Sequence, residues 1–387
     1  MKITNILSVI TLACLILSCK KEKVQDTSLS NETKSFANST QAVITATDKV
    51  FDGPYVFQEN GKTQVKYILD KKSGLTISSQ SIDSPKDVEF TVGFNDTPSW
   101  NFNVKISKEL KQTPSRWKTD DKIFVISDIE GEFSVLRDLL IGAGVINDKY
   151  EWTFGNGQLI IGGDTFDRGK QVPECLWLFY KLEAEGGNLH FLLGNHDVMN
   201  ISGSQSNYVN SKYFKTVQTL GLKKPLDLYA KNTVLGAWLR TKNIIEIGNN
   251  ILFVHAGVSR ELVDEYPNST IENFNTISKA NYDSPKATTS SKDFLTGDQS
   301  LIWFRGYFKD PLLSQKDVDF ISKHFAVDHM IFGHTTHPEV GSFYNGKVYC
   351  TDVDTHDGIR QGILIKPGDI AYKLSITGKN TVSTTKL

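Results

Sequence analysis

The chain of 387 residues contains only 4 cysteines, which is too few for a disulfide framework. Cys14 and Cys19 lie near the N-terminus, whereas Cys175 and Cys350 lie far apart, in a helical pattern and a strand pattern respectively. We therefore predict that Cys175 and Cys350 are two buried free thiols. A bridge between them is the less favoured alternative.

The sequence also lacks an excess of charge of either sign. Its 43 Lys and Arg residues and 44 Asp and Glu residues give a formal net charge of −1 at pH 7. Without a strongly basic balance, we expect neither nucleic acid as a structural partner nor a polybasic membrane patch. Local clusters of side chains must therefore carry any charge chemistry that the protein performs.

The N-terminus lacks an apolar run long enough for a comfortable transmembrane helix. The run from Ile6 to Leu17 follows the positive Lys2, which predicts a signal peptide over residues 1–19. It ends in "LILSC", which resembles a bacterial lipobox, so we predict that Cys19 carries a lipid anchor. Ordinary cleavage without a lipid is the alternative. The predicted location is the bacterial cell envelope, with the membrane contacted through the lipid alone.

Beyond this signal, the composition divides the chain into four parts. Residues 20–45 are rich in Ser, Thr, Asn, Lys and Gln, which predicts a flexible tether. Residues 46–115 contain alternating runs separated by Gly, Pro and Asn, which predict a small all-β domain. In residues 120–377 strand and helix patterns alternate, as is typical of an α/β fold. Residues 378–387 are expected to form a tail.

Five predicted strands of the α/β part end in the same way, with apolar residues followed by a polar cluster. They read FVISDIEG, LIIGGDTFDRG, HFLLGNHD, ILFVHAG and HMIFGHTTH. Because the carboxyl ends of strands in an open α/β arrangement converge on one crevice, these clusters should meet in space. Their polar side chains are Asp128, Glu130, Asp164, Asp167, Arg168, Asn195, His196, His255 and His334.

The types of side chain in this set favour a metal centre. Carboxylate, amide and imidazole ligands without a thiolate suit Mn, Fe, Zn or Mg. One shared carboxylate can bridge two cations about 3.5–4 Å apart, and such a pair suits the hydrolysis of phosphate esters. We therefore predict two divalent metal ions as cofactors, with Mn favoured and Fe, Zn and Mg as alternatives.

The same segments, in the same order, resemble the calcineurin-like metallophosphoesterase superfamily. Its phosphoprotein phosphatases carry Gly-Asp-x-His-Gly, Gly-Asp-x-x-Asp-Arg-Gly, Gly-Asn-His-Glu, His-Gly/Ala-Gly and Gly-His, which appear here as SDIEG, GDTFDRG, GNHD, HAG and GHT. The "WFRG" stretch and the run before GNHD are most similar to the bacterial Shewanella-like branch. The resemblance covers about residues 120–377 and implies a metallophosphoesterase fold, with a central β-sandwich flanked by helices.

The resemblance also implies a role for each polar side chain. Asp164 resembles the carboxylate that bridges the two metals. His196 resembles the proton donor to the leaving oxygen, with Asp167 as its carboxylate partner. Arg168 and Arg305 resemble a clamp for phosphate, which Asn195 can also orient. The implied ligands of the first metal site are Asp128 and Glu130, and those of the second are Asn195, His255 and His334, with Asp164 shared by both.

Glu130 stands where the family's first motif has histidine. A carboxylate can still bind a hard cation, but it lowers the positive charge of the metal pair. We therefore predict a first metal site that prefers hard ions such as Mn or Mg. Two other histidines are weaker candidates: His337 matches the spacing of a further family histidine poorly, and His356 could line the pocket.

The function implied by the resemblance is a phosphatase that hydrolyses phosphomonoesters by direct attack of a metal-bridging hydroxide. Its substrates would be phosphorylated Ser, Thr or Tyr in proteins, or small phosphate esters. The Arg168 and Arg305 pair favours a terminal phosphate dianion over a diester. The alternatives are a phosphodiesterase or nucleotide hydrolase of the same fold, and a non-catalytic binding lipoprotein with a decayed metal site.

Overall fold

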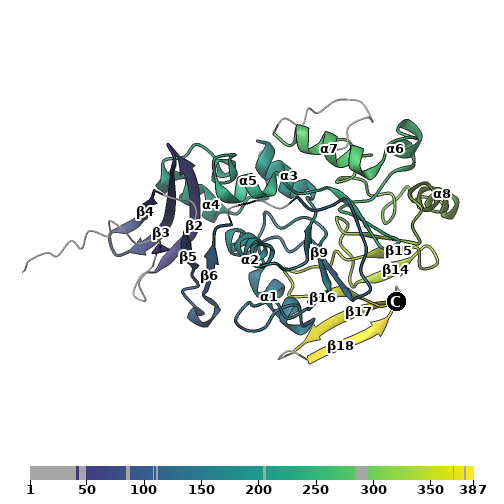
Figure 1. Ribbon diagram of the computed structural model, residues 1–387, viewed down its shortest axis with the longest axis horizontal. Coiled ribbons are helices and arrows are strands. Elements are labelled where there is room, and N and C mark those ends of the chain that lie inside the picture. The colour runs from purple at the N-terminus through teal and green to yellow at the C-terminus, as the bar shows by residue number, and fades with distance from the viewer. Residues whose placement is uncertain are drawn as a thin grey trace, which may run out of the picture. The chain divides into compact units, whose positions relative to one another are not determined.

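The computed structural model describes residues 41–42, 49–83, 88–107, 109, 112–203, 206–283, 295–368, 370–378 and 381–387. The predicted signal peptide and Cys19 lie outside these residues and stay predictions. Within the described parts of the chain, no helix is long and apolar enough to cross a membrane. The chain from Ser39 to Leu387 forms one compact unit, and Figure 1 labels many of its helices and strands.

Two six-stranded sheets form the centre of the α/β part. The first has the strand order β10-β9-β8-β16-β17-β18, and the second has the order β14-β15-β13-β12-β11-β7. The strands of the first sheet are β8 (Ile123–Ile126), β9 (Gln158–Ile161), β10 (Leu189–Phe191), β16 (Gln361–Lys366), β17 (Ile370–Thr377) and β18 (Thr381–Lys386). The strands of the second sheet are β7 (Arg116–Trp117), β11 (Ile245–Gly248), β12 (Ile251–Val254), β13 (His329–Phe332), β14 (Gly341–Phe343) and β15 (Val348–Cys350).

The two sheets pack face to face. This packing, together with the helices on the outer face, explains why β8 is apolar at every position. Ile123 and Val125 belong to a core that also holds Phe253 of the second sheet. Phe124 and Ile126 point to the other face and join the core under the helices. Because alternate residues of a strand face opposite sides, a strand covered on both faces needs apolar residues at every position. The predicted β-sandwich flanked by helices is confirmed.

Helices cover the outer faces of both sheets. Contacts of α1 with β17 and of α2 with β10 place these two helices on the first sheet, and α7 contacts β11 of the second. In α1, Phe133, Leu136 and Leu140 recur on one face and are fully buried. The helices are α1 (Phe133–Gly142), α2 (Val172–Ala184), α3 (Asn195–Ser202), α4 (Ser211–Leu220), α5 (Val234–Leu239), α6 (Arg260–Glu265), α7 (Ile271–Asn281) and α8 (Gln315–Phe325), with the 3₁₀ turns η2 (Pro98–Trp100) and η3 (Pro225–Tyr229).

The predicted all-β part is present as two three-stranded sheets. They contain β2 (Val50–Glu59), β3 (Lys62–Lys71) and β4 (Gly74–Ile82), and β1 (Gln41–Ala42), β5 (Glu89–Val92) and β6 (Phe102–Lys105). These sheets share a core with the α/β part: Trp177 of α2 donates to the Pro54 carbonyl oxygen at 2.9 Å, and its ring centroid lies 4.7 Å from that of Phe90. The all-β part is therefore packed on the α/β part rather than separate from it.

Two predicted boundaries are corrected. The expected tail contains β18, which pairs with β17 from Thr377↔Thr381 to Tyr372↔Lys386. Its residues are exposed because it is an edge strand, so it lacks the apolar pattern that marks the inner strands. The predicted tether also ends early, since β1 pairs with β5. The prediction of two free thiols is confirmed, because Cys175 and Cys350 are both buried and unbridged.

Candidate active site

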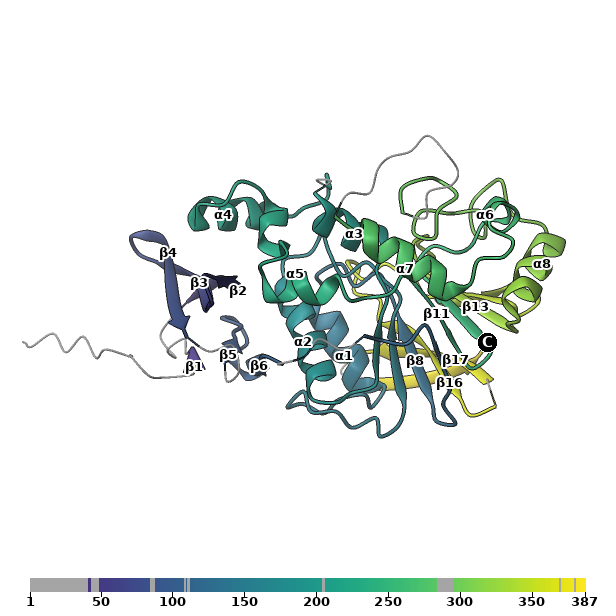
Figure 2. The same cartoon turned by 45° about the horizontal axis from the view of Figure 1, so that its top comes forward.

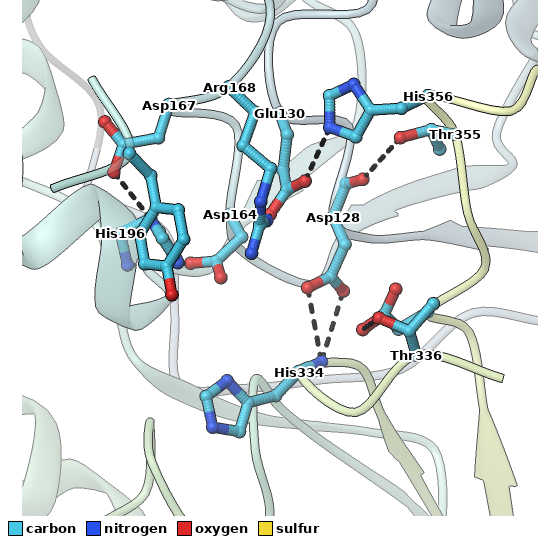
Figure 3. A network of polar contacts seen from close by, with 12 residues as sticks. Asp128, Glu130, Asp164, Asp167, Arg168, His196, His334, Thr336, Thr355 and His356 are labelled. Atoms are coloured by element: carbon cyan, nitrogen blue, oxygen red, sulfur yellow. Dashed lines mark hydrogen bonds and ion pairs between the residues drawn. The ribbon is translucent and has the colours of Figure 1, made fainter. Parts of the chain in front are cut away.

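The five predicted strand ends meet at one edge of the sandwich. β8, β9 and β10 run parallel in the first sheet, and β12 and β13 run parallel in the second, so their carboxyl ends point the same way. Figure 3 shows side chains that follow β8, β9, β10 and β13 converging on one centre. The polar clusters therefore meet as the strand-end rule requires.

The loops that carry these clusters have an unusual backbone. A left-handed φ is uncommon for residues other than glycine and costs on the order of 1–3 kcal/mol where the region is sparsely populated. The packed strands on either side hold this backbone in place and aim the side chains at one point. The predicted site residues with positive φ are Asp128 (53°), Glu130 (46°), Asp164 (55°), Asp167 (75°), Arg168 (51°) and His334 (66°).

Two motif glycines allow the loops to approach one another. A Cβ atom on Gly194 would lie 2.1 Å from Asp164 Oδ1, and a Cβ atom on Gly333 would lie 2.2 Å from Asp128 Oδ2. No side chain fits at such distances, so the carboxylates occupy the space that these glycines leave. The close approach of these carboxylates therefore explains why GNHD and FGHT have glycine at these two positions.

The second predicted metal site joins residues from β9, β12, β13 and the start of α3. Donor atoms of Asp164, His255 and His334 lie within 4.8 Å of one another. His255 Nε2 lies 3.1 Å from Asp164 Oδ2 and 3.0 Å from the side-chain amide of Asn195. Its Nδ1 lies 2.9 Å from the Gly162 carbonyl oxygen. The imidazole is therefore oriented with Nε2 toward the cluster, as a metal-binding histidine is.

The first predicted metal site surrounds the other side of Asp164. Glu130, Asp164 and His196 offer donor atoms within 4.8 Å of one another. Both oxygens of Asp128 accept from the His334 backbone N–H, at 3.2 and 3.3 Å. Burial raises the pKa of the Asp128 carboxyl to about 6, and the nearby Asp164 adds to the shift. Several buried carboxylates this close together need a positive counter-charge.

His255 shows which kind of counter-charge fits. Burial by itself would lower the pKa of the His255 imidazole, but Asp164 and Asp128 raise it to about 10. The same carboxylates would attract a cation bound beside this imidazole. Oxygen and imidazole donors in a buried acidic pocket suit a divalent cation, so the residues fit the two predicted metal ions.

Glu130 contacts two further side chains besides facing the metal cluster. Its Oε1 forms an ion pair with Arg168 Nη1, and its Oε2 lies 2.8 Å from His356 Nε2 (Figure 3). His356 Nδ1 in turn lies 3.0 Å from Glu132 Oε1. Glu130 therefore orients Arg168, which a histidine in the same place could not do by an ion pair.

His196 and Asp167 form the predicted pair. His196 Nδ1 lies 2.6 Å from Asp167 Oδ2, and Asn200 donates to Asp167 Oδ1 at 3.0 Å. With Nδ1 engaged, the imidazole has Nε2 left for a ligand in the cavity. Burial by itself would lower the pKa of His196, but the carboxylates of Asp164 and Asp167 raise it above its usual value. The two carboxylates thus favour the proton-carrying form of the imidazole.

Arg168 and Arg305 reach the same cavity from different loops. Arg305 Nη1 donates to the His334 carbonyl oxygen at 2.7 Å and to Thr335 Oγ1 at 3.3 Å. The Arg168 guanidinium lies over the exposed ring of Tyr208, 4.9 Å from its centroid. Two guanidinium groups held in this way can bind an anion with several oxygens.

The cavity has a volume of about 280 Å³, and the predicted residues divide into its lining and its support. The buried Asp167, Asn195 and His255 are not in the lining and stand behind it. The structure thus brings all ten predicted site residues together. The predicted residues in the lining are Asp128, Glu130, Asp164, Arg168, His196, Arg305 and His334.

A sixth strand end also lines the cavity and is not among the five that the sequence patterns predicted. β15 runs parallel to β13, and the loop after it contributes Asp352, Thr355 and His356 to the lining. Thr355 Oγ1 donates to the Asp128 carbonyl oxygen at 3.1 Å. The signal was present as "VYCTDVDTHDG", an apolar run followed by a polar cluster, so the strand-end rule could have found it.

One weak candidate from the sequence lies outside the cavity, and one residue that no sequence pattern predicted lies beside His196. His337 does not line the cavity; its ring packs against Phe308 and Phe343, with centroids 5.0 Å apart in both pairs. Tyr208 was not predicted, although its ring centroid lies 5.4 Å from that of His196. It comes from the loop before α4, where nothing in the sequence marks it.

Comparisons with known proteins agree with this geometry. A model of the calcineurin-like phosphoesterase family matches residues 121–338. The chain is similar to Shewanella-like protein phosphatase 2 of Arabidopsis thaliana, at 24% identity over 305 residues, which are 66% of this chain and 76% of that protein. It is also similar to Shewanella-like protein phosphatase 1 of Plasmodium berghei, at 24% identity over 253 residues, covering 61% of this chain and 67% of that one.

A solved structure extends the similarity beyond the α/β part. The crystal structure of a cold-active protein-tyrosine phosphatase from a psychrophilic Shewanella species matches with a TM-score of 0.74 and 29% identity. The match covers 86% of this chain and 98% of that one, which is more than residues 120–377 alone could supply. Because the family model matches more than half of the sequence, the chain belongs to the calcineurin-like phosphoesterase family of metal-dependent phosphatases.

Proposed function

We propose that this protein is a phosphomonoesterase that removes phosphate from phosphorylated proteins, with phosphotyrosine as the first substrate to test. The observation that carries the proposal is the joint presence of His196, Arg168 and Arg305 around one small acidic cavity. The proposal of a protein substrate is supported by relatives named as protein phosphatases and by a structural neighbour named as a protein-tyrosine phosphatase.

The arginines would bind and orient the phosphoryl group. Arg305 is anchored by the His334 carbonyl oxygen and Arg168 by Glu130, so neither side chain has to be ordered when the substrate arrives. A phosphomonoester has three non-bridging oxygens and carries two negative charges. A diester has two non-bridging oxygens and carries one negative charge. Two guanidinium groups therefore discriminate in favour of the monoester.

His196 would supply the proton that the leaving oxygen needs. Its Nδ1 is held by Asp167, and the neighbouring carboxylates raise the pKa of the imidazole, which favours its proton-carrying form. The leaving group would depart on the side of His196 and the exposed Tyr208 ring. An oxygen that leaves as an alkoxide or phenolate is stabilised most by such a proton when its own basicity is high.

The metal ions would be held by the buried carboxylates and imidazoles described above. Asp164 is common to both groups of donor atoms, which supports its assignment as the shared ligand. When bound, divalent cations supply charge neutralisation for the phosphoryl oxygens and a more acidic water. Mn is our first choice, because Asp128, Glu130 and Asp164 would give the first metal three oxygen ligands, which suit a hard cation.

The test of the proposed function is turnover by the purified protein in Mn, Fe, Zn or Mg. We expect hydrolysis of p-nitrophenyl phosphate and of phosphotyrosine peptides, and much slower hydrolysis of bis(p-nitrophenyl) phosphate. If the diester were the better substrate, the protein would be a phosphodiesterase instead. If no phosphate ester were hydrolysed in any of these metals, the enzyme proposal would be wrong.

The pH profile should depend on Asp167. In an Asp167→Asn variant the carboxylate that raises the pKa of His196 loses its charge, so the imidazole loses its proton at lower pH. We expect the alkaline limb of the kcat/KM profile to move to lower pH, with a loss of roughly tenfold or more at neutral pH. An exposed control, Asp148→Ala, should leave the profile unchanged. If the alkaline limb did not move in Asp167→Asn, Asp167 would not be the residue that raises the pKa of His196.

Glu130 should affect metal preference and phosphate binding separately. Glu130→His restores the family ligand but removes the ion pair with Arg168. We expect a shift of activity from Mn or Mg toward Zn or Fe, together with a rise of roughly threefold to tenfold in KM. Metal content by elemental analysis and KM in each metal are the readouts. If Glu130→Ala left metal content unchanged and raised only KM, Glu130 would orient Arg168 without binding metal.

A further inference from the structure

We propose that a groove beside the active site binds the polypeptide that flanks the phosphorylated residue of a protein substrate. This flanking groove lies between the N-terminal sheets and the loops of the active site, and its lining includes Phe51, Trp100, Glu132, Lys170, Glu174 and Lys215. The inference rests on the proposed function and specifies which substrates that function would serve. Figure 2 shows α4, which forms one wall, next to the β2-β3-β4 sheet, which it contacts.

The flanking groove adjoins the active-site cavity. Arg168 lines both of them. Glu132 lines the groove and lies 3.0 Å from His356, which lines the cavity. A chain whose phosphoryl group is held by Arg168 can therefore continue directly into the groove.

The cavity and the groove differ in volume, so they can hold different parts of a substrate. The active-site cavity has a volume of about 280 Å³, whereas the flanking groove has a volume of about 720 Å³. Sites that hold a drug-sized ligand are typically about 300–1,000 Å³. The cavity therefore suits a phosphoryl group with its leaving atom, and the groove has room for a short stretch of peptide.

The charge of the groove favours acidic peptides. Lys170 and Lys215 are exposed, and neither forms an ion pair among the described residues. Lys212, by contrast, is held by Asp52 at 2.8 Å. Two carboxylates with exposed surface line the groove as well, Asp96 and Glu132, and Glu132 faces His356. Arg168 lies in the same lining, so its guanidinium and the two free lysines leave the exposed rim with one positive charge in excess.

The floor of the groove includes a buried carboxyl group beside two aromatic rings. Glu174 is only 6% exposed, and its Oε2 has no hydrogen-bond partner among the described residues. Its Oε1 lies 3.8 Å from Lys212 Nζ. Phe51 and Trp100 add partly buried aromatic surface beside it.

The test compares two phosphotyrosine peptides that differ only in their flanks, four glutamates in one and four glutamines in the other. We expect the wild-type protein with Mn to show a KM about five- to tenfold lower for the glutamate peptide. Lys170→Glu combined with Lys215→Glu should abolish this preference and leave p-nitrophenyl phosphate turnover unchanged. Lys316→Glu combined with Lys323→Glu, on the exposed side of α8, is the matched control and should behave as wild type.

Each outcome bears on one proposal at a time. Equal KM values for the two peptides, or a preference that survives the Lys170 and Lys215 reversals, would overturn the flanking groove while p-nitrophenyl phosphate turnover still supports the enzyme. If the wild type hydrolysed no ester at all, the proposed function would fail. Binding of the two peptides, measured by fluorescence anisotropy, would then still test the groove by the same preference and the same variants.

Discussion

An Asp164→Ala variant should lose phosphatase activity by a factor of about a thousand or more and bind less than the full complement of metal. Asp164 is common to both groups of donor atoms, and it is only 2% exposed. Its Oδ1 also accepts from the His196 backbone N–H at 2.9 Å, and its Oδ2 lies 3.1 Å from His255 Nε2. Removing this carboxylate therefore disturbs both predicted metal positions and the proton donor together.

The measurements for this variant are kcat/KM with p-nitrophenyl phosphate and metal content after dialysis. Thermal unfolding followed by circular dichroism shows whether the variant still folds. The surface variant Asp148→Ala removes the same charge at an exposed residue outside the cavity lining and should keep full activity. An Asp164→Ala protein that folds, binds two metals and keeps more than about a tenth of the rate would exclude Asp164 as the shared ligand.

His196→Ala should have the second largest effect, and its size should depend on the leaving group. General acid catalysis typically contributes about 10²–10⁴-fold when the leaving oxygen is strongly basic. We therefore expect a loss of about a thousandfold with phosphoserine peptides or alkyl phosphates. With p-nitrophenyl phosphate, whose leaving phenolate is weakly basic, we expect a loss of about tenfold.

The comparison of leaving groups separates a proton donor from a residue that only shapes the site. A structural role would reduce turnover of both esters by the same factor. His324→Ala, in α8 and outside the cavity, is the control for loss of an imidazole and should leave both rates unchanged. Equal losses for alkyl and nitrophenyl esters in His196→Ala would argue against the proton-donor role. The short distances from the His196 imidazole to Glu130 and Asp164 would then favour a metal-binding role for His196.

Much of the candidate site could be predicted because its signals are local in the chain. Each buried strand needs apolar residues on both faces, and each is followed directly by its polar cluster, as in β8 with Asp128 and Glu130. Parallel strands then bring those clusters to one edge without further information. Arg305 was found only through the resemblance, since it follows no strand.

Other features could not be predicted, because they depend on segments that are distant in sequence. β18 is an exposed edge strand whose only role is to pair with β17, so it carries no apolar signature. Tyr208 reaches the site through the position of the loop before α4. The packing of the all-β part on Trp177 also has no signal in the sequence, since it joins residues far apart in the chain.

The sequence by itself determined the ligand types, their order and the fold that collects them, because these follow from strand patterns and adjacent polar residues. Only the tertiary structure decided what Glu130 contacts. Its carboxylate meets Arg168 and also His356, a residue 226 positions away, and no local pattern encodes that pairing. The tertiary structure likewise decided that Arg168 borders both the cavity and the flanking groove, since that depends on how the N-terminal sheets pack against the active-site loops.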